Sequence, residues 1–333
     1  MKTLKLLFGA GAMLILILDA ETALKSAMDG IHLCFASVAP ALFPFLVLSI
    51  YLTGNLSGTQ IPGMKYLGKL CRIPPGSEGI LLTGLLGGYP VGAQAVRQAY
   101  DAGGLSRQEA RRMLGFCSNA GPAFIFGILS PLFIDLRTTW FLWLIHIVSA
   151  ILTGIFLPGG YTGSDRKQTA QNLSFPDSVH RAIRVMASIC GWVVVFRILI
   201  GFLDRWVFWL LSSELKTILS GLLELTNGCL ILRTIDTEPL RFLIASIVLS
   251  FGGLCVGMQT VSVTGTLGTG LYFPGKLLQT MVSILLCTFT MPVLYPGNTV
   301  WDITILTVIA ISLLLFCLHL RKNNSSNFHL QGV

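Results

Sequence analysis

Two copies of one eight-residue pattern, G-G-x-x-V-G-x-Q, lie inside apolar stretches of this 333-residue chain, at positions 87–94 and 252–259. Glycine lacks the Cβ atom that penalises unusual backbone angles, so these glycines can interrupt a helix at little cost. A broken helix at membrane depth leaves peptide groups unpaired, and these are tolerated only where protein or a water-filled cavity surrounds them. Paired interruptions in two halves of an apolar chain point to the binding site of a transporter. The pattern therefore predicts a transporter with its site at the two breaks.

The first copy supplies four candidate substrate-binding residues. Gly88, Tyr89 and Pro90 lie where the helix is expected to break, and Pro90 has no backbone N–H to donate. Gln94 lies one turn further on, with an amide that both donates and accepts. Free N–H groups and the helix dipole at the new helix start favour an anion by about 0.3–1 kcal/mol. The alternative is that the glycines only permit close helix packing. The candidates in the second copy are Gly257 and Gln259.

A second candidate segment is C-S-N-A-G-P at positions 117–122. An asparagine in a membrane helix must find hydrogen-bond partners, and a proline inside a helix frees a carbonyl. We therefore expect an unwound stretch whose carbonyls and amide face the substrate. The alternative is a proline kink that a serine hydroxyl satisfies. The candidate residues are Ser118, Asn119, Gly121 and Pro122.

Glu224 is a carboxylate inside an apolar run, followed closely by Thr226 and Asn227. A charged residue at bilayer depth costs about 2.5–3.5 kcal/mol on insertion scales and usually faces a functional interior. Glu224 and Thr226 are therefore candidates to couple Na⁺ or H⁺, and Asn227 to bind substrate. Arg197, deep in another apolar run, either binds a substrate carboxylate in bidentate fashion or neutralises Glu224. These two roles of Arg197 stay open here.

The composition indicates an integral membrane protein with all-α, polytopic architecture. Hydrophobic residues make up 53% of the chain and charged residues 11%, with a mean hydropathy of +0.75, whereas soluble chains carry about 25% charged residues. The net charge of +8 is typical of basic cytoplasmic loops. No basic stripe with interleaved aromatics indicates a nucleic-acid partner. We expect no enzyme, no metal and no cofactor, because P-loop, H-E-x-x-H, G-x-S-x-G and C-x-x-C patterns are missing from the sequence.

Hydropathy and loop charge predict the organisation of the chain. Basic residues flank the first glycine segment on both sides, which predicts a re-entrant or broken-helix hairpin at 79–100. Arg233 and Arg241 precede the second segment and Lys276 follows it, so a second such hairpin is expected at 242–265. The predicted spans are 32–54, 112–133, 139–157, 184–203, 216–232, 276–295 and 303–318. The predicted units are a membrane segment or signal anchor at 1–22, a first repeat at 23–157, a cytoplasmic linker at 158–180, a second repeat at 181–320 and a polar tail at 321–333. The charge count favours parallel repeats, but the repeats are inverted if 204–213 or 216–232 lies along the surface.

The motifs resemble those of the YlbJ-type sporulation integral membrane proteins. The resemblance rests on A-P-A-L-F-P-F at 39–45, on the first glycine segment, similar to S-G-Y-P-x-G-A-K, on E-A followed by N-x-x-P-x-F-I-x-G within 109–127, and on G-x-x-E-x-T-x-G at 221–228. It implies a Gate-type nucleoside-recognition domain and transport of dipicolinate across a membrane around the forespore. Gln94 replaces the lysine of the family pattern, which weakens an anion contact there or transfers it to Arg97.

We therefore expect a secondary transporter of a small anionic or heteroaromatic solute in the cell membrane, with dipicolinate as the solute that the resemblance implies. A nucleoside transporter is the alternative within the same class. A non-transporting membrane scaffold for sporulation is the alternative from another class. The expected partners are the small-molecule substrate and the lipid bilayer, and the oligomeric state stays open.

Overall fold

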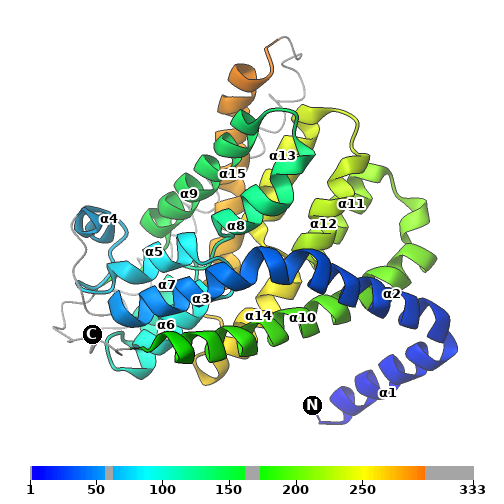
Figure 1. Ribbon diagram of the computed structural model, residues 1–333, viewed down its shortest axis with the longest axis horizontal. Helices are drawn as coiled ribbons and strands as arrows, with labels where there is room; N and C mark the ends of the chain where they lie inside the picture. Colours follow the sequence, from blue (N-terminus) through cyan, green and yellow to red (C-terminus); the bar gives the residue numbers. More distant parts are fainter. Residues whose placement is uncertain (1, 57–62, 162–172, 297–333) are drawn as a thin grey trace, which may run out of the picture.

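The computed structural model describes residues 2–56, 63–161 and 173–296, and these ranges contain helices and no β-strand (Figure 1). Five helices in them are long and apolar enough to cross a membrane: Ala20–Leu52, Leu136–Phe156, Phe175–Trp206, Glu238–Leu267 and Tyr272–Leu294. The protein is thus an all-α polytopic membrane protein, as predicted. The predicted span 303–318, the tail 321–333 and residues 162–172 of the predicted linker lie outside the described residues.

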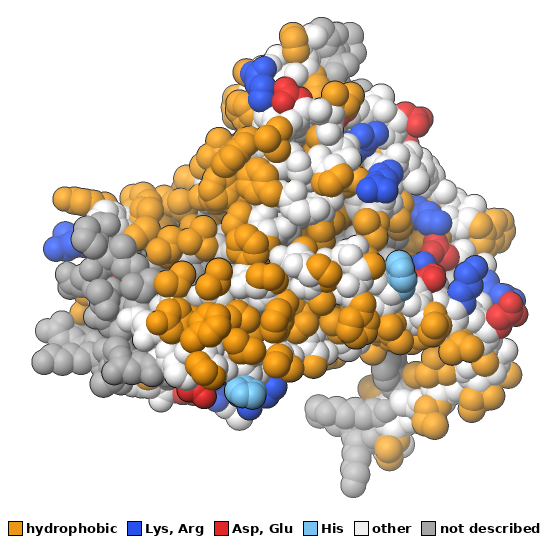
Figure 2. Space-filling view, in the orientation of Figure 1, with side chains coloured by type: hydrophobic (Ala, Val, Ile, Leu, Met, Phe, Trp, Pro, Cys, Tyr) orange, Lys and Arg blue, Asp and Glu red, His pale blue; other side chains and the backbone are white. Residues whose placement is uncertain are grey.

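The N-terminal helices form a long surface of apolar side chains. Helix α1 (Lys2–Leu18) ends before Asp19, whose side chain accepts a hydrogen bond from the Thr22 amide and so begins α2 (Ala20–Leu33). A short π-helical segment (Cys34–Val38) joins α2 to α3 (Ala39–Leu56). Helix α10 (Phe175–Trp206) packs along α2 and α3. Apolar side chains cover the α2–α3 face (Figure 2), among them Leu24, Phe35, Phe45 and Leu48.

The first glycine segment forms the tip of a helical hairpin. Helices α5 (Glu78–Leu86) and α6 (Val91–Asp101) are about 14 and 17 Å long, which is too short to cross a hydrocarbon core of about 30 Å. They pack against each other at Gly84 and Gly92. A Cβ atom at either glycine would overlap the Cys117 carbonyl oxygen, so glycine is required for this close approach.

The predicted span 216–232 is a second hairpin instead. Helix α11 (Ser213–Leu223) ends at Glu224, and α12 (Leu225–Ile231) begins directly after it and packs back against α11. A Cβ atom at Gly228 would overlap Gly221 of α11, so two glycines face each other here as they do in the first hairpin. The span prediction was wrong because hydropathy registers the apolar run but not the chain reversal at Glu224.

Two interrupted helices follow the hairpins. After α7 (Arg107–Met113) the chain leaves the helix, and positions 118–121 have no regular structure before α8 (Pro122–Phe124) and its continuation to Leu132. Helix α13 (Glu238–Phe251) breaks at Gly252, with φ +82°, before α14 (Gly253–Thr264). Since α13 and α14 do not pack side by side, the second glycine segment is a broken helix and not a re-entrant hairpin.

Helices α9 (Leu136–Phe156) and α15 (Tyr272–Leu294) pack together in opposite directions. A Cβ atom at Gly115 would lie 2.6 Å from the Leu157 side chain and 2.7 Å from the Leu271 carbonyl, so the end of α9 and the start of α15 meet at this glycine. Figure 1 shows the same relationship, with α9 descending from the top of the view and α15 ascending to it.

The described chain passes twice through one order of elements: a long helix, a hairpin, an interrupted helix and a long helix. The first series is α3, α5–α6, α7–α8 and α9, with the short α4 (Met64–Leu70) inserted, and the second is α10, α11–α12, α13–α14 and α15. Interrupted helices α7–α8 and α13–α14 run in opposite directions in Figure 1. The two copies of G-G-x-x-V-G-x-Q therefore occupy different elements, because the first forms a hairpin tip and the second a helix break.

Candidate functional site

A buried lysine lies where the elements of the two halves meet. Lys276 of α15 is fully buried. Its ammonium donates to Asn119 Oδ1 at 3.2 Å and to Gln279 Oε1 at 2.7 Å, and lies 5.0 Å from the centre of the Tyr89 ring. No carboxylate pairs with it in the described chain. Removing an ammonium from water costs several kcal/mol, whereas a cation–π contact returns about 0.5–2 kcal/mol. The charge of Lys276 is therefore solvated by dipoles without being neutralised.

Further hydrogen bonds join the partners of Lys276 to α9 and to the unwound stretch. Gln279 also donates to Asn119 Oδ1 at 3.0 Å and to the His146 carbonyl of α9 at 3.4 Å. The His146 ring accepts from the Ala120 amide at 3.1 Å, so a side chain of α9 satisfies a backbone N–H of the unwound stretch. We call Tyr89, Asn119, His146, Lys276 and Gln279 the lysine cluster. Its hydrogen bonds hold the unwound stretch in place, because buried backbone groups outside a regular helix need other hydrogen-bond partners.

Sequence reasoning identified Asn119 and Tyr89 of this cluster but missed Lys276 and Gln279. The position of Lys276 at the edge of the predicted span 276–295 indicates a loop charge, whereas α15 begins one turn earlier, at Tyr272. A buried lysine carries no information about loop topology, so Lys276 does not support a hairpin at the second glycine segment. The available signal was the spacing of three residues between Lys276 and Gln279, which puts both on one helix face.

Tyr89 links the first hairpin tip to both breaks. Gly88, with φ +80°, lies against Gly121, and a Cβ atom on Gly88 would be 3.2 Å from the Gly121 amide nitrogen. The Tyr89 hydroxyl donates to the Leu249 carbonyl at 3.5 Å, and the Tyr89 ring borders Gly252. Pro90 precedes the first turn of α6, and Pro122 begins α8. The hairpin tip therefore contacts the unwound stretch of one half and the broken helix of the other.

Glu224 caps the helix that follows it. One carboxylate oxygen accepts from the Thr226 amide at 3.0 Å, and the other accepts from the Asn227 amide at 2.7 Å and the Asn227 side chain at 2.8 Å. Glu224, Thr226 and Asn227 are all buried. The helix N-terminus stabilises the negative charge, so the carboxylate is held at the tip of the second hairpin without an arginine.

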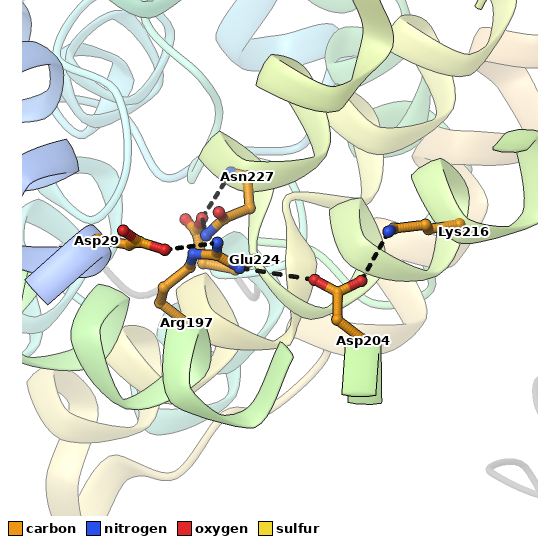
Figure 3. Close-up of polar contacts among 6 residues, drawn as sticks. All are labelled: Asp29, Arg197, Asp204, Lys216, Glu224 and Asn227. Carbon is orange, nitrogen blue, oxygen red and sulfur yellow. Dashed lines mark hydrogen bonds and ion pairs between the residues drawn. The ribbon is translucent and has the colours of Figure 1, made fainter. Parts of the chain in front are cut away.

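Arg197 does not neutralise Glu224, which corrects that sequence-based interpretation. Figure 3 shows the guanidinium of Arg197 between Asp29, at 3.1 Å, and Asp204, at 3.8 Å, and Asp204 also pairs with Lys216 at 2.8 Å. The Arg197 side chain is 22% exposed, so it is less buried than Lys276. Arg197 lies in a polar group that joins α2 and α10, and its charge is already matched by two carboxylates.

The remaining predicted residues make local contacts. Gln259 donates to the Cys255 sulfur at 3.5 Å within α14. Gly257 permits α14 to approach Phe273, since a Cβ atom there would lie 2.8 Å from the ring. Gln94 lies partly buried in α6. No hydrogen bond joins Gln94 or Gln259 to the lysine cluster in the described ranges. In the same ranges, no group of His, Cys, Asp and Glu is arranged to hold a metal ion.

Fold and site together define a multi-pass, all-α membrane protein with paired hairpins and interrupted helices around buried polar groups. The chain is similar to the sporulation integral membrane protein YlbJ of Bacillus subtilis (strain 168), with 21% identity over a match that covers 84% of this chain and 80% of that protein. This similarity confirms the resemblance to YlbJ-type proteins, at low identity. No protein-family model and no solved structure matches the chain.

Proposed function

We propose that this chain is a secondary transporter of a small anionic or heteroaromatic solute. The observation that supports the proposal most is the meeting of the first hairpin tip with interruptions of both halves, through Gly88 on Gly121 and through Tyr89 on Leu249. Irregular backbone at membrane depth is stable only around a protein-lined or water-filled interior. Such interruptions at a repeat interface are the recurring substrate site of secondary transporters.

We infer further that the two series of elements form an inverted repeat. A hairpin returns the chain to its own side, so each series of long helix, interrupted helix and long helix makes three crossings. An odd number of crossings reverses the following series, in keeping with the opposed α9 and α15. In inverted repeats, alternating access arises when one unit rocks against the other around a fixed site. Tyr89 lies at that boundary, so its contacts with the other half would change during the movement.

Glu224 is the proposed coupling residue, together with Thr226. Its two oxygens already accept three hydrogen bonds, but a carboxylate has about four acceptor positions, so capacity for Na⁺ or H⁺ remains. The carboxylate belongs to the second hairpin, whose tip contacts the broken helix because a Cβ atom at Gly253 would be 3.2 Å from the Leu225 amide. Cation binding there would change the position of the hairpin relative to α14.

The resemblance to sporulation proteins directs the substrate proposal to dipicolinate in a membrane around the forespore. A nucleoside is the second candidate, favoured by the amides of Asn119 and Gln279, which suit a neutral heterocycle. Substrate binding is proposed to use Tyr89 and Asn119, with no enzymatic step, no cofactor and no nucleic acid. A non-transporting membrane scaffold is the contrasting possibility.

The test is uptake of labelled dipicolinate and labelled uridine by purified protein in proteoliposomes, under imposed Na⁺ or proton gradients. We expect saturable dipicolinate uptake that Gly88→Leu and Asn119→Leu abolish in correctly inserted protein. Saturable uridine uptake without dipicolinate uptake would replace the first substrate by the second. Absence of both fluxes, with full function of both variants in sporulating cells, would favour the scaffold.

A further inference from the structure

We propose that Lys276, with Ser118 and His146, forms the receptor for one carboxylate of the transported solute. The inference rests on the proposed transport function and deepens it by naming the chemical group that is recognised. It also replaces Arg197 in that role, because the guanidinium of Arg197 is held by Asp29 and Asp204.

The charge of Lys276 is the first argument. Its ammonium is fully buried between two amide oxygens and an aromatic ring, and no described carboxylate pairs with it. Ionisable residues inside a membrane protein are rare and normally find a charged partner or mark a transport pathway. A single buried cation matches a single carboxylate, whereas a dianionic phosphate group would call for additional positive groups.

Unused hydrogen-bond donors, one in the lysine cluster and one on the residue next to Asn119, are the second, independent argument. The Nε2 atom of His146 accepts from the Ala120 amide, so in the neutral ring the proton lies on Nδ1. That Nδ1 atom is buried and has no partner, and the hydroxyl of Ser118, next to Asn119, is likewise buried and unpartnered. Buried donors without acceptors are rare in folded proteins and need an explanation. A ligand that only accepts hydrogen bonds, as a carboxylate does, satisfies both.

The two amides act as placeholders in this scheme. Asn119 Oδ1 and Gln279 Oε1 both accept from the ammonium, and the Gln279 side-chain amide also donates to Asn119 Oδ1. When the hairpin tip that carries Tyr89 moves, an entering carboxylate replaces the two amide oxygens as the hydrogen-bond partner of the ammonium. The site therefore combines one charge-assisted contact with neutral donors, which selects a carboxylate over its neutral carboxamide.

The experiment compares pyridine-2-carboxylate with its neutral isostere pyridine-2-carboxamide, and includes pyridine-2,6-dicarboxylate. Binding is measured on full-length protein in nanodiscs, by calorimetry and by ligand-induced thermal stabilisation, for wild type, Lys276→Met, Lys276→Arg and Ser118→Ala. Lys216→Met is the matched control, because that lysine is 38% exposed and pairs with Asp204. Ser118→Ala deletes a hydroxyl without a partner and keeps the test valid if Lys276→Met fails to fold.

We expect Lys276→Met to weaken binding of both carboxylates by at least about tenfold and Ser118→Ala by about threefold to tenfold, since hydrogen bonds to a charged group are the stronger kind. Carboxamide binding should change little, and Lys216→Met should bind like wild type. Wild-type carboxylate affinity in folded Lys276→Met, or in Ser118→Ala if Lys276→Met does not fold, would overturn the receptor while leaving transport intact. A wild type that binds and transports no carboxylate would overturn the receptor together with the proposed anionic substrate.

Discussion

The hydroxyl of Tyr89 in the first half donates to the carbonyl of Leu249 in the second half, at 3.5 Å. In a continuous helix that carbonyl would accept from the amide of Gly253, four residues later. The chain instead leaves the helix at Gly252, with φ +82°. One half of the protein therefore uses an acceptor that the helix break of the other half has freed, and the two interruptions depend on each other.

Replacing Tyr89 should separate the two roles of this side chain. Tyr89→Phe removes the hydroxyl but keeps the ring, so we expect a loss of about 0.5–1.5 kcal/mol in the free energy of unfolding. Tyr89→Leu also removes the ring over Lys276 and should cost a further ~0.5–2 kcal/mol. Reversible unfolding of the purified protein in detergent measures both. A Tyr89→Phe variant as stable as wild type would mean that the 3.5 Å contact contributes nothing.

Local chemistry explains which parts of this fold sequence reasoning anticipated. The unwound stretch at 118–121 was predicted because Pro122 cannot continue a helix and Asn119 needs partners, and both effects act within a few residues. The hairpin at 79–100 followed from basic residues on both flanks. Each of these features is decided by the segment itself.

The rest of the site depends on partners that are distant in the sequence. Lys276 and Asn119 meet only because α15 packs beside the unwound stretch, and hydropathy placed the lysine at a membrane edge. The two copies of the octapeptide form a hairpin tip and a helix break, whereas the counterpart of the first hairpin contains Glu224 and the facing glycines Gly221 and Gly228. A glycine pattern reports close packing and helix breaks without specifying the element that contains them.

Alanine at Gly92 should disrupt the first hairpin. A Cβ atom there would overlap the backbone carbonyl of Cys117, which cannot move away as a flexible side chain could. We expect Gly92→Ala to lower the yield of folded protein and to destabilise it by about 1–3 kcal/mol or more, as overpacking does. Size-exclusion profiles and thermal unfolding in detergent provide the measurement.

The matched control for Gly92→Ala is Gly191→Ala in α10, where a Cβ atom would have no heavy atom within 4 Å. Alanine is the better helix former by about 0.5–1 kcal/mol, so this variant should equal or exceed wild type in stability. Equal stability of both variants would contradict the close packing of the first hairpin on Cys117.

Two substitutions of Glu224 should separate its role in folding from its proposed role in ion coupling. Glu224→Ala removes the cap of α12 and leaves buried amides unsatisfied, so we expect a loss of about 1–3 kcal/mol. Glu224→Gln retains one acceptor and should stay inserted and folded, but with uptake that no longer responds to a Na⁺ or proton gradient. Glu214→Gln, in the first turn of α11, is the control and should respond as wild type does. Unchanged gradient dependence in Glu224→Gln would remove Glu224 from coupling.

A double-mutant cycle distinguishes the partners of Arg197. The Arg197–Asp29 pair is partly exposed, with side-chain exposures of 22% and 46%, so Arg197→Met and Asp29→Asn should show a coupling of about 0.2–1 kcal/mol that decreases with salt. Arg197→Met and Glu224→Gln share no hydrogen-bond partner, and their effects on the free energy of unfolding should add within about 0.5 kcal/mol. Denaturant titration of the single and double variants at two salt concentrations measures both couplings. A coupling well above 1 kcal/mol between Arg197 and Glu224 would restore the ion pair suggested by sequence and contradict the cap at α12.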